Sequence, residues 1–324
     1  MITMKHFSQG ALMLLLVFTL FTRCKKDDSI GSKGNVQFEI TDGPADDAAI
    51  KGAFVTIAQV KVDGKEISGF TGRQTIDLMA YQNGNTKALG LAELDARTYN
   101  DLTLVLDFEK DADVNSPGCY VLTTGNVKHN LQASSETMSE IKVNTGSFKV
   151  EESATAIVVL DFDVRKAIHY ENTPSVNDQY DFVTKDELRT SLRMVVKSKT
   201  GKVQGTCNDN LGLTNHIVVY AYKKGTFNKN TEITGQGESQ IEFKNAVTST
   251  AVDAQGNYTL SFLEEGDYEL HFFGYEDSNS DGKMEMLGEL ELAIAGGLGI
   301  DLSSISITAN SSVSVSVLVT GLLP

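Results

Sequence analysis

From Asn35 onward, apolar residues recur at every second position, and this spacing limits the chain to β-structure. Val36, Phe38 and Ile40 alternate with polar neighbours, as expected for a strand with one buried face. Turn residues separate similar short stretches, which predict strands at 54–62, 73–78, 99–108, 121–122, 141–143, 157–164 and 192–197. A second series follows at 202–207, 216–222, 241–252, 258–262, 268–273, 284–294 and 305–319. No helical pattern of useful length is found beyond one short turn at 164–168, so the predicted fold class is all-β, built of β-sandwiches.

The length of the chain, 324 residues, is enough for two domains of ~100–200 residues each. The stretch Lys199-Thr200-Gly201 separates the two series of strands. We therefore predict one sandwich at 35–198 and a second at 199–324.

The first residues have the pattern of a secretory signal peptide, predicted at 1–23. A basic head at Lys5 and His6 precedes an apolar run at 11–21, which is shorter than the ~20 residues of a spanning helix. Cys24 follows and is the predicted lipidation site, with 24–34 as a flexible tether. An ordinary signal peptide with Cys24 incidental is the alternative.

The stretch Cys24-Lys25-Lys26-Asp27-Asp28 resembles the start of mature lipoproteins of the Bacteroidota. In that group, Lys and Asp after the cysteine are similar to the signal that sends lipoproteins to the outer surface. Arg23 departs from the small residue usual at its position. The resemblance implies a lipid-anchored protein of the outer membrane, exposed at the cell surface.

The net charge of −15 and the pI of about 4.8 disfavour some partners. An acidic chain repels the phosphates of nucleic acids and anionic lipid heads. We expect no nucleic-acid partner, and an extracellular glycan or protein as the ligand.

The first series of strands carries a set of motifs in a fixed order: Thr41-Asp42-x-Pro44-x-Asp46, Val55-x-Ile57-x-x-Val60-x-Val62, Ile76-Asp77-Leu78, Gln82-Asn83-Gly84-Asn85, Leu89-Gly90, Tyr99, Leu102-x-Leu104-x-Leu106, Leu160-Asp161-Phe162-Asp163, Lys166 and Leu192-Arg193-Met194-Val195-Val196. Over roughly 34–197 this order resembles the domain of unknown function 4382 family of bacterial lipoproteins. The resemblance implies a fold and a location, and it implies no activity.

The second series carries Gly201-x-Val203-x-Gly205, Val218-x-Tyr220-Ala221-Tyr222, Asp253-Ala254-x-Gly256-x-Tyr258-x-Leu260 and Leu263-x-x-Gly266-x-Tyr268-x-Leu270. These motifs resemble the carboxypeptidase-regulatory-like or transthyretin-like sandwich. Members of that group serve as stalks, spacers and binding modules, so the resemblance implies a role of this kind.

One acidic stretch has the ligand pattern of a calcium loop. Asp277, Asn279 and Asp281 place side-chain oxygens at alternate positions, the Lys283 carbonyl adds another, and Glu285 follows. The expected flanks are strands, so we predict a weak Ca²⁺ site embedded in β-structure. An acidic hairpin that binds no metal is the alternative.

Other reactive residues give little support for catalysis. Asp161 and Asp163 lie on one strand face and form the one carboxylate pair to consider for glycoside hydrolysis, but a solvated strand face or turn is the more economical interpretation. The histidines of the mature chain stand apart, without zinc-ligand spacing: His129, His169, His216 and His271. No G-x-S-x-G and no phosphate-binding glycine loop occurs. We predict a protein that is not an enzyme.

Two cysteines besides Cys24 remain, Cys119 and Cys207. In an oxidising compartment they either form a disulfide that joins the two domains or stay as two separate buried thiols.

The sequence therefore predicts a surface-anchored lipoprotein that acts as a non-catalytic binding, adhesion or spacer module. The second hypothesis is a fimbrial, pilin-like subunit that assembles by exchanging its last strand, 303–319. A carbohydrate-active enzyme is the third hypothesis.

Overall fold

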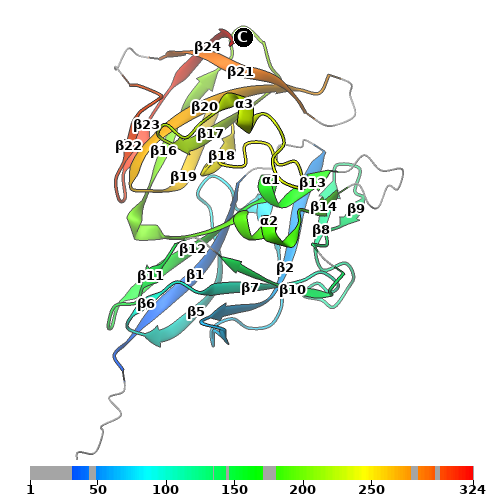
Figure 1. Ribbon diagram of the computed structural model, residues 1–324, viewed down its shortest axis with the longest axis vertical. Coiled ribbons are helices and arrows are strands. Elements are labelled where there is room, and N and C mark those ends of the chain that lie inside the picture. The colour runs from blue at the N-terminus through cyan, green and yellow to red at the C-terminus, as the bar shows by residue number, and fades with distance from the viewer. Residues whose placement is uncertain are drawn as a thin grey trace, which may run out of the picture. The chain divides into compact units, whose positions relative to one another are not determined.

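The computed structural model describes residues 31–43, 49–133, 135–143, 146–170, 180–278, 284–295 and 300–323. Residues 32–324 form one compact unit. Strands β1–β15 pair only with one another, and so do strands β16–β24 (Figure 1). We call these two groups the N-terminal and the C-terminal sandwich. The domain boundaries at 198 and 199 stay a prediction.

The predicted fold class, all-β with sandwiches, is confirmed. The few helices of the described residues are short: η1(Leu78–Ala80), α1(Val164–Ala167), α2(Lys185–Thr190), η2(Lys197–Lys199) and α3(Lys229–Glu232). The helical turn expected at 164–168 is α1. None of the helices in the described ranges is long and apolar enough to cross a membrane.

The N-terminal sandwich consists of two main sheets. The first has the order β15(Leu192–Val196), β12(Thr155–Asp163), β1(Lys33–Gly43) and β5(Lys87–Asp95). The second has the order β10(Met138–Val143), β7(Leu102–Asp107), β2(Ile50–Val62), β8(Tyr120–Thr123) and β9(Lys128–Asn130), with β3(Lys65–Glu66) and β4(Gln74–Asp77) also on β2. Two small ribbons complete it: β6(Thr98–Tyr99) with β11(Phe148–Lys149), and β13(Ile168–Tyr170) with β14(Tyr180–Phe182).

The core of this sandwich lies between the inner faces of the two main sheets. Phe38 and Ile40 from β1 and Ile57 from β2 are fully buried in one cluster. Their every-second-residue spacing in the sequence is the cause, because successive side chains of a strand point to opposite faces. The hairpin between β2 and β3 turns at Asp63 and Gly64, both with positive φ, as a two-residue type I′ turn requires.

The C-terminal sandwich is one curled sheet with the order β18(Thr248–Ala251), β17(His216–Lys223), β20(Gly266–Glu276), β21(Glu285–Ile294), β24(Val317–Leu322), β16(Thr200–Asn208) and β19(Asn257–Glu264). β22(Ile305–Ile307) pairs with β20, and β23(Ser312–Ser314) pairs with β16. Its main core includes Val203, Val219 and Phe272.

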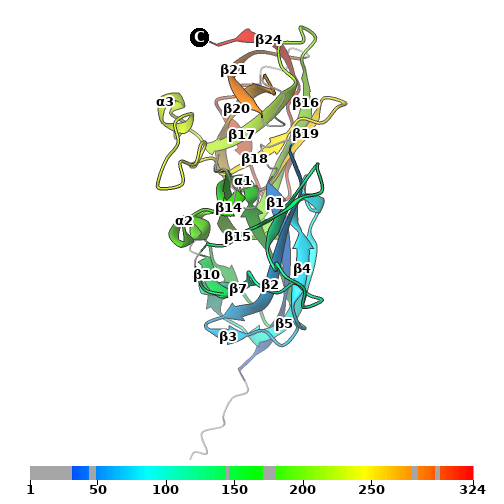
Figure 2. The same cartoon turned by 90° about the vertical axis from the view of Figure 1, so that its right-hand side faces the viewer.

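The outer face of β17 and β20 is also buried. Residues 224–247, which carry α3, cover it (Figure 2). Phe243 from this segment stacks on Tyr220 with ring centroids 3.9 Å apart. The strand expected at 241–252 is therefore limited to β18, because the residues before it form this cover.

The strand expected at 305–319 is also interrupted. It consists of β22, β23 and β24, with Asn310 at a φ of 57° between the first two. A strand residue has negative φ, so the chain turns at this point. β24 lies between β21 and β16 of its own chain.

Candidate functional site

Three acidic side chains gather where β1 and β12 end. The two strands are parallel, with Thr41 opposite Asp161 and Gly43 opposite Asp163. Parallel strands bring their carboxyl ends to the same sheet edge, and so Asp42, Asp161 and Asp163 come together there. All three side chains are buried. Buried carboxylates need partners, because the unpaired charge is costly away from water.

Arg193 is the partner of Asp161. The two residues lie opposite each other on the antiparallel strands β15 and β12. Nε of Arg193 donates to Oδ2 of Asp161 at 2.8 Å, and Nη1 donates to the carbonyl oxygen of Phe262 at 2.8 Å. A side chain of the N-terminal sandwich thus binds the main chain of β19 in the C-terminal sandwich.

Asp163 and α1 supply two further links of this kind. Asp163 is the N-cap of α1, and its carboxylate lies 3.1 Å from Nη2 of Arg165 and 3.4 Å from Nζ of Lys166. Arg165 donates to the carbonyl of Glu242 at 2.6 Å. Lys166 donates to the carbonyl of Ala246. We call Asp161, Asp163, Arg165, Lys166 and Arg193 the ionic cluster.

The protonation of the cluster follows from its pairing. Burial alone would raise the pKa of Asp163, but the charges of Arg165 and Lys166 outweigh it and lower that pKa. Burial lowers the pKa of Lys166, and Asp163 opposes this effect. The carboxylate of Asp163 therefore stays charged and serves as the counter-ion of two cations.

Asp42 differs from the other two carboxyl groups. Its Oδ1 accepts from the backbone N–H of Val164 at 2.9 Å. Its Oδ2 is buried and has no hydrogen-bond partner among the described residues, as is also true of Oγ of Ser249. Burial raises the pKa of Asp42 well above its usual value, and the nearby carboxylates of Asp163 and Asp161 add to this effect.

Asp42 and Ser249 line a small cavity of about 10 Å³. Thr41 and Asp161 lie on its wall from the N-terminal sandwich, and Thr250 from the C-terminal one. A cavity of this size holds about one water molecule. It has no room for a substrate.

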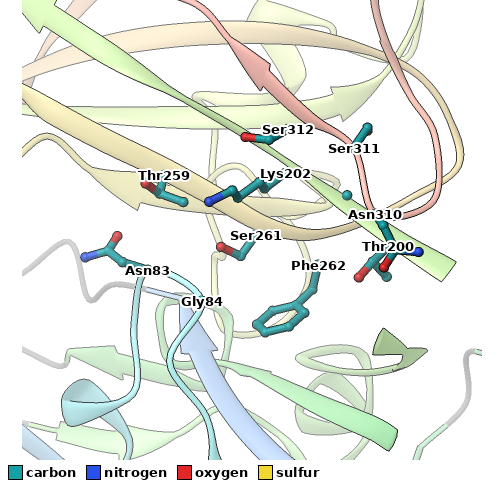
Figure 3. Close-up of a pocket in the computed structure, with 11 residues that line it drawn as sticks. Asn83, Gly84, Thr200, Lys202, Thr259, Ser261, Phe262, Asn310, Ser311 and Ser312 are labelled. Carbon is teal, nitrogen blue, oxygen red and sulfur yellow. The ribbon is translucent and has the colours of Figure 1, made fainter. Parts of the chain in front are cut away.

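A larger pocket of about 310 Å³ opens beside it (Figure 3). Asn83 and Gly84, from the loop between η1 and β5, form one side. The other lining residues come from β16, from β19, from the turn after β22 and from the start of β23: Thr200, Gly201, Lys202, Thr259, Ser261, Phe262, Asn310, Ser311 and Ser312. The lining is thus mainly hydroxyl and amide groups.

A β-bulge shapes the wall of this pocket. The register of β16 and β19 shifts so that Ser261 and Phe262 stand opposite the single residue Lys202. Phe262 has a φ of 57°, which is uncommon for a bulky residue. Its ring packs on Val159 and Val195 of the N-terminal sandwich. The bulge aims the Phe262 ring toward that surface, and both Ser261 and Phe262 line the pocket; re-aiming a side chain in this way is a usual effect of a bulge.

Gly84 completes the pocket because it has no side chain. Its φ is 87°, and a Cβ at this position would lie 2.7 Å from Oγ of Ser261. Both the conformation and the close approach require glycine.

The carboxylate pair considered from the sequence, Asp161 and Asp163, forms buried ion pairs with Arg193, Arg165 and Lys166 of the same sandwich. The interpretation that the sequence favours is a solvated strand face or turn. The solvated face is wrong, because both side chains are buried, whereas Asp163 does lie at a turn, as the N-cap of α1. Sequence reasoning missed the contacts with the C-terminal sandwich.

The calcium loop lies only partly within the described residues. Asn279, Asp281 and Lys283 lie outside them. Asp277 and Glu285 are described, and Glu285 accepts from both N and Oγ of Ser278 at 2.9 Å. Within the described ranges, no group of three or more His, Cys, Asp or Glu is placed to hold a metal ion. The Ca²⁺ site stays a prediction.

The disulfide between Cys119 and Cys207 is not formed. Both are free, buried thiols, one in the core of each sandwich. Sγ of Cys119 accepts from the backbone N of Thr56 at 3.4 Å and donates to the carbonyl oxygen of Asp107 at 3.4 Å. Burial raises the pKa of both thiols to about 12. The alternative of two separate buried thiols describes the structure. Cys24, the predicted lipidation site, lies outside the described residues.

Residues 33–183 match the family model of a domain of unknown function, DUF4382. This match supports the family resemblance of the N-terminal series of strands. Comparison with curated proteins finds no match.

Several solved structures are similar to this chain at low identity. The minor pilin GBS52 of Streptococcus agalactiae is 14% identical, with a TM-score of 0.22, over 89% of this chain and 97% of the pilin. The shaft pilin SpaA of Lactobacillus rhamnosus GG is 12% identical, with a TM-score of 0.20, over 90% of this chain and 100% of SpaA. The Bacillus anthracis TIE protein is 12% identical, with a TM-score of 0.19, over 89% of this chain, which spans only 34% of that protein. TM-scores of this size carry no functional information.

Proposed function

We propose that this protein is a surface-anchored lipoprotein that acts as a non-catalytic binding, adhesion or spacer module. The observation that carries the proposal is the ionic cluster. Arg193, Arg165 and Lys166 each donate to a main-chain carbonyl of the other sandwich. Such contacts hold two sandwiches as one unit, which suits a protein that presents a surface at a distance from its anchor.

The same cluster argues against the enzyme hypothesis. A glycosidase needs two carboxyl groups facing a cleft that admits a sugar. Asp161 and Asp163 instead face cations, and the cavity next to Asp161 measures about 10 Å³.

The anchor is tested by metabolic labelling with a fatty-acid analogue. We expect label on the wild type and none on Cys24→Ala, because the thiol of Cys24 is the proposed attachment atom. Ser29→Ala is the control within the same segment. Equal labelling of wild type and Cys24→Ala would refute the anchor.

Protease treatment of intact cells then tests exposure at the surface, and protection from protease would place the protein elsewhere.

The pilin-like alternative needs the last strand to leave its own chain. In the structure Val317 lies next to Cys207 in the β16–β24 register. A Val317→Cys variant, made with Cys24→Ala and oxidised, should therefore form a disulfide with Cys207 within one chain. A ladder of disulfide-linked multimers would support strand exchange and overturn the module proposal.

A further inference from the structure

The pocket of about 310 Å³ beside Gly84 differs in charge from the rest of the molecule. The chain carries a net charge of −15, yet no Asp or Glu is among the described residues that line this pocket. Two larger pockets among the described residues, of about 550 and 560 Å³, each include two carboxylates, Asp181 with Glu238 and Asp209 with Asp253. An anion in this pocket therefore contacts no acidic side chain of the described lining.

Lys202 supplies a positive charge at this pocket. Its side chain is exposed, and it makes no ion pair or side-chain hydrogen bond within the described part of the chain. It stands at the β-bulge, opposite Ser261 on β19, and is in register with Ser312 on β23. Lysine binds anionic groups as a flexible point charge.

Unpaired hydroxyl groups surround Lys202. The side chains of Thr259, Ser261 and Ser312 have no hydrogen-bond partner among the described residues. Each can both donate and accept a hydrogen bond. Figure 3 shows them around the pocket with Lys202. Groups that donate and accept are suited to the hydroxyls of a sugar, which do the same.

From this lining we infer that the pocket binds an acidic saccharide, with its carboxylate or sulfate group at Lys202 and its hydroxyls at Thr259, Ser261 and Ser312. The volume of about 310 Å³ is at the lower end of ligand pockets, so one sugar residue is the expected occupant. Phe262 lines the pocket but is buried against Val159 and Val195, so it offers no exposed ring for stacking.

This inference rests on the proposed binding role and names its ligand class. The test uses the full chain with Cys24→Ala, titrated with glucuronic acid, glucose or inorganic sulfate and followed by NMR shifts or calorimetry. We expect glucuronic acid to bind about tenfold more tightly than glucose, because one charge-assisted contact is worth about this factor. Lys202→Gln should abolish the preference.

Matched controls separate this site from general charge effects. Lys87→Gln removes another exposed lysine, which forms no ion pair with the described residues, and it should leave the preference unchanged. Ser312→Ala should weaken both sugars alike. The inference is overturned if glucose binds as tightly as glucuronic acid, if no sugar binds, or if sulfate alone binds as tightly as the acidic sugar. Those results leave the labelling of Cys24 untouched, whereas chemical conversion of the sugar would refute the non-catalytic role itself.

Discussion

Arg193 donates to the carbonyl of Phe262 at 2.8 Å while it is paired with Asp161, its neighbour across the sheet. The guanidinium of Arg193 thus makes two contacts at once. It neutralises a buried carboxylate of the N-terminal sandwich and fixes the bulged strand of the C-terminal one.

Arg193→Ala should therefore destabilise the fold strongly. It leaves the carboxylate of Asp161 buried without its cation, which typically costs about 3–5 kcal/mol. Denaturant unfolding measures the loss. The control is Arg189→Ala, which breaks the exposed pair with Asp186 and should cost less than about 1 kcal/mol. Equal losses of unfolding free energy in the two variants would show that the buried contact between Arg193 and Asp161 stabilises the fold no more than an exposed ion pair does.

Asp42 predicts a pH dependence with a definite sign. Because burial raises its folded pKa above the unfolded value, the folded state binds the proton more tightly. The stability from this proton is complete below the unfolded pKa of about 3.9 and is lost as the pH rises through the folded pKa.

Asp42→Asn stays neutral at every pH, and its amide oxygen can still accept from Val164. We therefore compare the unfolding free energy of Asp42→Asn with that of the wild type. The difference should be near zero at pH 4. Above that pH it should grow in favour of the variant by about 1.4 kcal/mol per pH unit, until the pH passes the folded pKa of Asp42. Urea unfolding across pH measures the difference. The exposed Asp113→Asn should show no such trend, and a flat difference for Asp42→Asn would contradict the prediction.

Calcium should stabilise the wild type. If the loop from Asp277 to Glu285 binds Ca²⁺, a concentration ten times the Kd adds about 1.4 kcal/mol, which raises Tm by a few degrees. Mg²⁺ should act less, because it keeps its waters. Thermal melting of wild type and Asp281→Ala checks this, with Asp113→Ala as the control for lost charge. A shift that persists in Asp281→Ala would leave the loop as an acidic hairpin.

The thiols of Cys119 and Cys207 should be unreactive in the folded protein. With pKa values raised to about 12 by burial, Cys119 and Cys207 carry almost no thiolate at neutral pH, and thiolate is the reactive form. A chain with Cys24→Ala should react very slowly with a thiol reagent when folded. In denaturant without reductant it should show two thiols. None in denaturant would mean that the disulfide forms after all.

The sequence predicts the strands well where one face of the sheet is buried. Val36, Phe38 and Ile40 place an apolar residue at every second position, which indicates a strand with one buried face, and β1 lies where this pattern predicts it. The pattern fails for residues 241–247, because Phe243 is apolar for a different reason: it covers the outer face of a sheet and stacks on Tyr220. Local spacing does not distinguish a strand from an apolar segment that packs on one.

The candidate sites were harder to predict for a related reason. The sequence shows Asp161 and Asp163 as a pair, but their partners Arg193 and Lys166 become neighbours only through strand pairing and the cap of α1. Nothing in the sequence marks Lys202 as a binding residue, beyond its place in the motif with Gly201 and Gly205. A pocket formed by segments more than a hundred residues apart leaves no local trace in the sequence.

The three cations between the sandwiches all bind backbone carbonyls, of Phe262, Glu242 and Ala246. A carbonyl is present at every residue, whatever its side chain. Substitutions on the C-terminal side can therefore accumulate without removing these acceptors, as long as the chain keeps its path. In evolutionary terms, the N-terminal sandwich carries a general-purpose connector, and sandwiches of quite different sequence could be joined to it while the junction is retained.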